Sequence, residues 1–369
     1  MNLGSLAWLA VIPALGFLVV IHEIGHYWVG RKMGIKIEEF GIGLPPRAKV
    51  LFVRKGVPFT LNWLPLGGFV RFAGEESGFD DPDSLLSASP RRRIPVLAAG
   101  VIANVLVAML LFGLIFAIWG MPDDNVVSVE STDVVATAAG FEIDDLIRSI
   151  NGTPITSIDQ ISPLVQANQA KPMTVMIERD GVSQTIVAAP TLRAETGRYL
   201  LGIGLGNPLG PVNPLVALWN GVTYSVRVLG DMFLGFASLI GGLLGLNAKP
   251  EGGLAGPVGI ARITGAVAKT GLREYLNLTA ILSLNLALIN ILPIPALDGS
   301  RIVFALIEAV RRKKIAPERE AFVHAIGMMM LLGLMLLVTV ADVKNVITGE
   351  PPIAMPATSV PATPAPGTP

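Results

Sequence analysis

The chain contains no cysteine, only three histidines, and few charged residues for its length. Without cysteine it can form no disulfide and offer no thiolate ligand, so any zinc site must be built from histidine, aspartate or glutamate. Charged residues make up 15% of the chain, against about 25% in an ordinary soluble domain, while 51% of the residues are hydrophobic. The formal net charge is zero, which argues against nucleic acid as a partner. These figures predict an integral membrane protein that lies in a lipid bilayer and carries some polar mass outside it.

Two of the three histidines lie four residues apart at the end of an apolar run. Residues 22–26 read HEIGH, and residues 6–21 before them carry no charge. An H-E-x-x-H pattern on a helix places both imidazoles on one face, where His22 and His26 can bind one metal ion with Glu23 beside it. Ionisable groups at membrane depth are costly, so they indicate a functional site. The alternative is a pair of core histidines satisfied by hydrogen bonds.

Hydrophobic runs predict about four transmembrane helices. The first run is expected to be retained rather than removed as a signal peptide, since no basic residue precedes it and no small-residue cleavage site follows. The loop between the first two spans contains Arg31, Lys32 and the basic residues 91–93, so the positive-inside rule places this loop in the cytoplasm. The predicted spans are the run from residue 6 into the HEIGH motif, and residues 94–119, 275–297 and 325–340.

Residues 215–246 form a further apolar stretch whose course is ambiguous. If this stretch crossed the bilayer, the strongly basic connection at residues 301–319 would fall outside the cell, against the positive-inside rule. We therefore expect residues 215–246 to lie in the outer membrane interface without crossing.

A catalytic zinc ion takes three protein ligands and keeps one open position, so the HEIGH motif needs a third ligand. Asp298 ends the uncharged run at residues 276–297, and Pro293 and Pro295 interrupt the helix just before it. The carboxylate can therefore leave the helical path and reach inward. Its span runs from outside to inside like the first span, so Asp298 and His22 lie at the same depth.

His324, the remaining histidine, is the competing third ligand. It lies at the start of the last span, beside Glu318 and Glu320. A histidine at a helix end is more often a solvated end group, so its position favours Asp298 as the ligand.

Residues 36–71 alternate short apolar runs with turn residues. Residues 49–53 and 58–63 predict a β-hairpin with Gly56 at the turn. Because the hairpin is too apolar for water, we expect it to lie partly in the bilayer against the metal site, where its edge could pair with an extended substrate. The alternative is an ordinary hairpin on the membrane surface.

Residues 121–206 have the composition of a small soluble domain. A strand, a hairpin turn at Asn151-Gly152, a helix and two alternating strands at residues 173–178 and 184–187 together resemble a PDZ domain. Residues 199–205, YLLGIGL, are expected to supply the closing strand and loop of a circularly permuted version. Asp144-Asp145 stands where that family usually has Gly-Asp.

The predicted fold is thus an α-helical integral membrane protein with a membrane-associated β-hairpin and an inserted extracytoplasmic α/β PDZ domain. The proline-rich tail cannot form a packed core and is predicted to be disordered. The expected parts are an N-terminal membrane half at residues 1–120, the PDZ domain at 121–206, a membrane-associated segment at 207–274, a C-terminal membrane half at 275–345 and the tail at 346–369.

Two motifs in this order, with a PDZ-like segment between them, resemble the site-2 protease family of intramembrane zinc metalloproteases. The resemblance is to the bacterial, regulator-of-sigma-E-protease-like branch with one PDZ domain. HEIGH matches the family's HExGH, and NILPIPALDG at residues 290–299 matches its second motif. Further similar segments are EEFGIG at 38–43, LPLGGFVRFAGE at 64–75, AGVIAN at 99–104 and GPVG at 256–259. Val101 departs from the pattern, because proline is usual there.

The resemblance implies a role for each matching residue. Glu23 would be the general base and acid, and Zn2+ would be the cofactor. The implied zinc ligands are His22, His26 and Asp298, and the implied substrate-binding residues are Gly41, Gly43, Asn104, Asn290, Pro293 and Pro295.

The resemblance also implies an activity, which is cleavage of transmembrane segments in regulated intramembrane proteolysis. The expected substrates are single-span membrane proteins such as anti-sigma factors, or signal-peptide remnants, first cut by an upstream site-1-type protease. The expected location is the inner or plasma membrane, with several spans, an extracytoplasmic PDZ domain and an active site near the cytoplasmic side. Two alternatives are a membrane-tethered zincin that cuts misfolded proteins at the aqueous face, and a non-enzymatic PDZ scaffold or proton-relay transporter.

Overall fold

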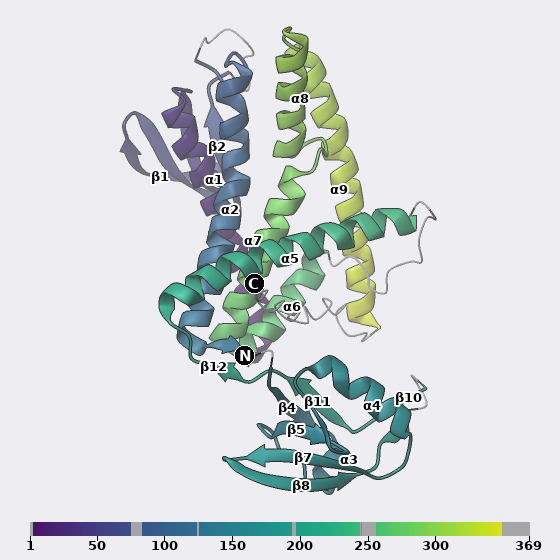
Figure 1. Ribbon diagram of the computed structural model, residues 1–369. Helices are drawn as coiled ribbons and strands as arrows, with labels where there is room; N and C mark the ends of the chain where they lie inside the picture. The colour runs from purple at the N-terminus through teal and green to yellow at the C-terminus, as the bar shows by residue number, and fades with distance from the viewer. Residues whose placement is uncertain are drawn as a thin grey trace. The chain divides into compact units, whose positions relative to one another are not determined.

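A computed structural model describes residues 3–74, 83–123, 125–193, 197–243, 245 and 256–348 of the chain (Figure 1). The described residues divide into two compact units. The membrane unit is formed by Met1–Ile115 with Leu218–Ala357, and the second unit by Phe116–Ala217. Most of the predicted disordered tail, from residue 349 onward, lies outside the described residues.

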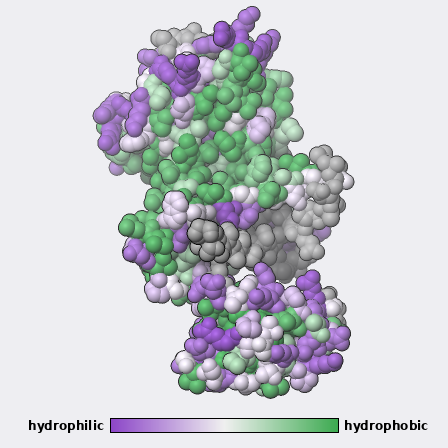
Figure 2. Space-filling view, viewed as in Figure 1, coloured by the Kyte–Doolittle hydropathy of each residue, from purple (hydrophilic) through white to green (hydrophobic). Residues whose placement is uncertain are grey.

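Five helices within the described ranges are long and apolar enough to cross a membrane, judged by length and composition. Apolar side chains cover much of the visible face of the membrane unit in Figure 2, as expected for a surface that contacts lipid. The five are α1 Val11–Lys32 with the preceding 3-10 helix η1 Leu3–Ala10, α2 Pro90–Trp119, α5 Pro214–Leu243, α7 Leu272–Ile291 and α9 Pro317–Ile347.

Helix α5 is the one candidate span beyond the predicted four. Within the membrane unit it runs across the other long helices instead of alongside them (Figure 1). Length and composition do not decide whether α5 crosses the bilayer, so its interfacial placement stays a prediction.

The chain leaves its helical path just before Asp298. Helix α7 ends at Ile291, ahead of Pro293 and Pro295, and helix α8 spans Asp298–Arg311. Proline lacks the N–H that continues a helix, which accounts for the break. Asp298 therefore begins a new helix at the end of an irregular loop.

The predicted hairpin is present, and its strands are longer than the sequence pattern indicated. Strand β1 Ile37–Arg54 pairs antiparallel with β2 Val57–Phe72 across a turn at Lys55-Gly56. Near its start, β1 pairs with both halves of β2, since Gly41 is opposite both Thr60 and Phe69. The bent pair therefore forms a small sheet in which the end of β2 lies at one edge.

This small sheet packs against α1, the helix that contains the HEIGH motif. Tyr27 of α1 meets Phe40 edge-on with 5.8 Å between ring centroids, and Phe40 stacks on Phe59 at 4.9 Å. Helix α2 approaches α1 closely at Gly25, where an added Cβ would lie 2.8 Å from the backbone carbon of Ala99. Sheet and helices together hold the HEIGH segment in place.

The second unit is built on an antiparallel sheet with its own core. Among its described residues, six strands form this sheet in the order β11-β4-β5-β7-β8, with β6 paired to β5. The turn between β5 and β6 uses Asn151 and Gly152 at positive φ, as the sequence predicted. The strands are β4 Val127–Thr132, β5 Leu146–Ile150, β6 Thr153–Pro154, β7 Met173–Arg179, β8 Val182–Ala188 and β11 Ile203–Gly206.

The last strand of the six-stranded sheet in the chain, β11, lies beside the first, β4. Strand β11 pairs antiparallel with β4, although some 70 residues separate them. A short strand, β10 Arg198–Leu200, precedes β11 and pairs with β9 Thr191–Arg193. Two helices, α3 Val134–Ala139 and α4 Ile161–Asn168, complete the unit, and Ile161 and Val165 of α4 enter its core.

The Asp144-Asp145 pair has two distinct structural roles. Asp144 has φ 72°, a left-handed conformation that glycine adopts most easily and that aspartate tolerates. Asp145 is fully buried, and its carboxylate accepts hydrogen bonds from Arg179 Nε at 2.7 Å and from the Glu142 N–H at 2.9 Å. Burial alone would raise the pKa of Asp145, but these bonds outweigh it and hold the pKa below its ordinary value.

We expect Arg179→Gln to destabilise the second unit and to change its response to acid. Removing the cation leaves the buried Asp145 carboxylate without its ion-pair partner, which costs about 3 kcal/mol of unfolding free energy at neutral pH. Because the pKa of Asp145 is lower in the folded state, its contribution is present above the unfolded pKa of about 3.9 and is lost as pH falls through the folded pKa. Urea unfolding at several pH values, followed by hydrogen exchange of this unit, measures both effects.

Arg148→Gln is the matched control for this substitution. Arg148 pairs with Glu178 at 3.0 Å, but both side chains are about a third exposed, so its removal should cost less than about 1 kcal/mol. If Arg179→Gln lowered the free energy of unfolding no more than this control, and left its dependence on pH unchanged, the stabilising role assigned to the Asp145–Arg179 pair would be contradicted.

Candidate metal centre

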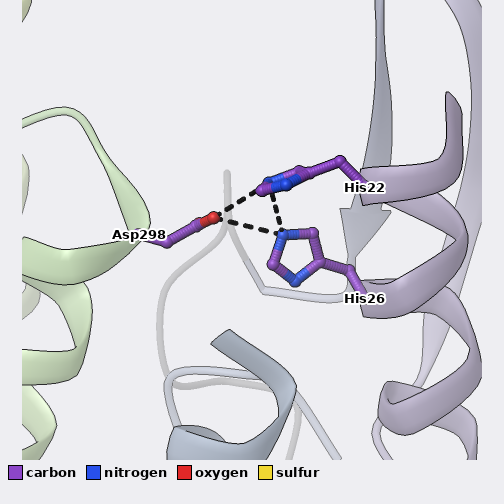
Figure 3. Close-up of side chains that lie close together, drawn as sticks. All are labelled: His22, His26 and Asp298. Atoms are coloured by element: carbon purple, nitrogen blue, oxygen red, sulfur yellow. Dashed lines mark hydrogen bonds and ion pairs between the residues drawn. The ribbon is translucent and has the colours of Figure 1, made fainter. Parts of the chain in front are cut away.

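Three side chains predicted as ligands from opposite ends of the chain lie together in the membrane unit (Figure 3). His22 and His26 extend from one face of α1, and Asp298 extends from the start of α8. The Oδ2 atom of Asp298 lies 3.0 Å from His22 Nε2 and 3.2 Å from His26 Nε2, and the two Nε2 atoms are 3.0 Å apart. Within the described part of the chain, this is the group of His, Asp and Glu residues placed to hold a metal ion.

The donor set and its spacing fit zinc. Two imidazole nitrogens and one carboxylate oxygen form a usual ligand set for catalytic zinc, which keeps a fourth position open. Ligand atoms about 2.0–2.1 Å from a tetrahedral ion lie roughly 3.3 Å from one another. The observed separations of 3.0–3.2 Å are close to this value, so a small outward shift of the three side chains would accommodate the ion.

The ring of His26 is held in the tautomer that a metal ligand needs. Its Nδ1–H donates to the main-chain oxygen of Val96 on α2, at 2.8 Å. The proton therefore lies on Nδ1 and leaves Nε2 free to bind a metal, an arrangement typical of metal-binding histidines.

Asn104 gives His22 the corresponding support. Its side-chain amide is fully buried on α2, with Nδ2 3.4 Å from His22 Nδ1, and its Oδ1 has no hydrogen-bond partner among the described residues. Turning the amide by 180° places Oδ1 where it accepts from Nδ1–H, which frees His22 Nε2 for the metal and pairs the buried oxygen. The family resemblance implied a substrate-binding role for Asn104. The contact with His22 supports a role in orienting that ring, and Asn104 also lines the cavity beside Glu23.

We expect Asn104→Ala to weaken zinc binding about 10-fold or more, because loss of a hydrogen-bond partner to a metal ligand commonly costs 10–100-fold. Asn104→Asp keeps an oxygen acceptor and should retain tighter binding. Competition with a chelator, without substrate, measures the affinity. Ser283→Ala is the control, since the Ser283 hydroxyl donates to the main-chain oxygen of Asn104, at 2.8 Å, and not to its side-chain amide. Equal zinc affinity in Asn104→Ala and wild type would exclude this role.

Gly100 on α2 leaves the space that the two imidazoles occupy. An added Cβ there would lie 2.6 Å from His22 Nε2 and closer still to His26 Nε2. Any side chain at residue 100 would therefore displace the metal-facing nitrogens. This glycine was part of a family-like segment in the sequence, but nothing in the pattern indicated that it faces the histidines.

Glu23 lines a cavity of about 200 Å³ next to the three candidate ligands. The opposite wall includes Asn290 from α7 and Ala296 from the loop before α8. Gly68, at the edge of the small sheet, also approaches Glu23, since a Cβ on Gly68 would lie 3.4 Å from Glu23 Cγ. A carboxylate, a side-chain amide and a sheet edge thus surround one small cavity.

The remaining predicted substrate-binding residues do not line this cavity. Gly41 and Gly43 are buried within β1, where Gly41 lies beneath the ring of Phe69 and Gly43 adopts φ 81° against the Leu64 carbonyl. Pro293 and Pro295 shape the loop that leads to Asp298. The positions of these four residues support a role in shaping the site, not in direct contact with a substrate in the cavity.

Comparison with known proteins gives consistent matches over most of the chain. A model described as peptidase family M50 matches residues 10–334. A relative from Clostridium perfringens, which has zinc metalloprotease in its name, is 34% identical over 331 residues, covering 89% of this chain and 96% of its own. The regulator of sigma-W protease RasP from Bacillus subtilis is 30% identical over 419 residues, covering 91% of this chain and 98% of its own. The zinc metalloprotease RasP from Bacillus licheniformis is 30% identical over 420 residues, covering 91% and 98%.

Proposed function

The chain belongs to peptidase family M50 and is an intramembrane zinc metalloprotease, and from this membership we propose that it cleaves transmembrane segments of single-span membrane proteins. In this proposal His22, His26 and Asp298 bind the zinc ion and Glu23 is the general base. The observation that carries it is the convergence of the three ligand atoms, which all lie within 4.8 Å of one another. The resemblance to the site-2 protease family is confirmed by the family match.

The chemistry assigns a separate task to each residue around the cavity. A bound zinc ion supplies Lewis-acid chemistry, which activates water and polarises a peptide carbonyl. Glu23 takes a proton from the attacking water and passes it to the leaving amine. Asn290 lines the same cavity, so its amide can donate a hydrogen bond that holds the substrate carbonyl. Residues of the apolar α1 and α7 exclude bulk water from the site.

A transmembrane helix must unwind before its carbonyl groups become accessible, because they are hydrogen-bonded within the helix. The edge of the small sheet near Gly68 offers a place where an extended substrate can pair by strand addition. Gly41 and Gly43 shape this sheet, and Pro293 and Pro295 shape the loop on the facing side. Substrates with helix-breaking residues would therefore be cut most readily.

The charge pattern of the chain supports the sidedness of the proposal. Basic residues flank the HEIGH helix and the α8–α9 connection, so the active site is proposed near the cytoplasmic side of a multi-pass protein. The second unit, with the strand order and closing strand described above, is proposed as an extracytoplasmic PDZ domain that excludes substrates with bulky ectodomains. Helix α5 is proposed to lie in the outer interface, and its transverse course in Figure 1 supports this placement.

Exclusion of bulky ectodomains requires that another protease shorten the substrate first. The name of the Bacillus subtilis relative, regulator of sigma-W protease, supports substrates that are membrane-anchored regulators of a sigma factor, such as anti-sigma factors. Signal-peptide remnants have the same single-span form and a short outer segment. Both classes suit the proposed site.

Cleavage of a single-span reporter by the purified chain in liposomes tests the proposal. We expect a cut within the reporter's transmembrane segment, mapped by mass spectrometry, that stops when a chelator removes zinc and returns when zinc is added. A reporter with a large folded ectodomain should be cut poorly. Cleavage only outside the transmembrane segment would instead favour a membrane-tethered zincin, and zinc binding without any cleavage would favour a scaffold.

A further inference from the structure

His324 is outside the metal cluster but contacts the loop that positions one of its members. Its Nδ1 atom accepts a hydrogen bond from the main-chain N–H of Ala296, at 2.9 Å. Ala296 is two residues before Asp298 and lines the cavity beside Glu23. Helix α9 therefore has a direct polar contact with the segment that leads to the proposed third ligand.

Ala296 has a backbone conformation that needs support from its surroundings. Its φ is 84°, in the left-handed region that residues other than glycine, asparagine and aspartate seldom occupy. Such a conformation persists when neighbouring contacts over-determine it. The hydrogen bond to His324 constrains Ala296 at its N–H, and this in turn sets the direction in which Asp298 leaves the loop.

Helix α9 is well placed to give this support. At Gly327, one turn after His324, an added Cβ would lie 2.7 Å from the main-chain carbon of Pro295, so the helix and the loop are in close contact. One turn before His324, Glu320 accepts two hydrogen bonds from Arg93 of α2, at 2.7 and 2.8 Å. Because Arg93 and Glu320 are both buried, this pair fixes α9 against the helix that supports His26.

The hydrogen bond also determines the tautomer of His324. Since Nδ1 accepts from Ala296, the ring proton lies on Nε2. Within the described ranges Nε2 is buried without a hydrogen-bond partner, and the nearest Glu320 oxygen is 3.9 Å away. A buried polar atom without a hydrogen-bond partner is unfavourable, so an apolar side chain would fill this position without the cost of the unpaired Nε2. The hydrogen bond that Nδ1 accepts from Ala296 is therefore the contact that accounts for a histidine ring here.

We propose that His324 is a positioning residue that holds Ala296, and through it aligns the Asp298 carboxylate with His22 and His26. The inference rests on the proposed function, since it requires Asp298 to be a zinc ligand. It differs from the sequence-based alternative in which His324 itself binds the metal. In this proposal His324 acts on the loop through one hydrogen bond, which it accepts from the main-chain N–H of Ala296.

Three substitutions at residue 324 separate this role from simple packing. His324→Asn places an amide oxygen near the position of Nδ1 and should bind zinc within about threefold of wild type. His324→Ala and His324→Gln lack an acceptor at that position and should bind zinc 10- to 100-fold more weakly, the range typical for a residue that supports a metal ligand. Zinc affinity is measured by chelator competition on the full chain, and absorption of the cobalt-substituted protein reports ligand geometry without substrate.

Two variants on the same helix act as controls. Glu320→Gln weakens the pair with Arg93 and should lower the melting temperature, with a smaller loss of zinc affinity than His324→Ala, because Arg93 keeps its hydrogen bond to Glu308 at 3.2 Å. Met329→Ala alters a side chain that is 70% exposed and should change neither quantity. The proposal is overturned if His324→Ala binds zinc like wild type with an unchanged cobalt spectrum, if His324→Asn fails to rescue, or if Glu320→Gln loses zinc to the same extent.

Failure of the proposed function itself would have a different result. In that case the wild-type chain would bind no zinc, or Asp298→Ala would keep wild-type affinity, and both proposals would fall together. Loss of zinc in Asp298→Ala with unchanged affinity in His324→Ala would overturn only the positioning role.

Discussion

Replacing Glu23 by glutamine is expected to lower the rate of substrate cleavage about 1,000-fold or more while zinc stays bound. Glutamine has nearly the same size and shape as glutamate, but its amide cannot take a proton from water. General-base catalysis typically contributes 10²- to 10⁴-fold to a rate, and here the same group also protonates the leaving amine. Cleavage of the single-span reporter in liposomes and metal content by mass spectrometry measure the two quantities on one sample.

Glu38→Gln is the matched control for this change. Glu38 is exposed on β1, so the same chemical substitution there should leave both cleavage and zinc content close to wild type. Substantial cleavage by Glu23→Gln would contradict the assignment of the base. Loss of zinc in Glu23→Gln would show that Glu23 supports the metal, and the loss of rate could then not be assigned to proton transfer.

Replacing Asp298 by alanine is expected to weaken zinc binding by more than about 100-fold and to abolish cleavage with it. Loss of a direct ligand exceeds the 10- to 100-fold effect of losing a residue that only supports a ligand. The substitution also leaves two histidines, which cannot hold a catalytic zinc ion in a three-ligand site. Chelator competition on the purified chain measures the affinity directly, and the reporter assay measures the activity.

Asp342→Ala is the control for loss of a buried carboxylate. Asp342 is on α9 and accepts a hydrogen bond from the Gly259 N–H at 2.7 Å, near the start of helix α6 Pro257–Thr270. Removing the Asp342 carboxylate should reduce thermal stability without a loss of zinc, because Asp342 caps helix α6, which carries none of the candidate metal ligands. Full zinc content and activity in Asp298→Ala, with loss of both in His324→Ala, would make His324 the third ligand.

Local patterns in the chain were sufficient to predict the long helices, the hairpin and the main strands of the second unit. Helix spacing is set by the chain itself, so HEIGH predicts two imidazoles on one face of α1 before any tertiary contact is known. Proline chemistry likewise predicted the break after α7, which the structure places at Ile291. Strand ends were less accurate, since β1 and β2 extend further through pairings that depend on the bend in β1.

Predicting Asp298 needed a longer argument, because 276 residues separate it from His22. The inference used depth, since two spans with the same direction bring their cytoplasmic ends to the same level of the bilayer. The bilayer thus supplies a constraint on residue depth that a soluble protein lacks. It limits the depth of a side chain, but not which neighbour it touches at that depth.

By itself, therefore, the sequence determined the membrane class, the HEIGH pair with its glutamate, and an aspartate at matching depth, because each follows from composition, helical period or the energetics of charge in lipid. Only the tertiary structure decided that Gly100 leaves room for the imidazoles, that Asn104 faces His22, and that His324 contacts the loop before Asp298 instead of joining the cluster. These contacts join residues from 28 to 82 positions apart. Such contacts depend on how helices rotate and pack against one another, and no local pattern in the chain specifies that rotation.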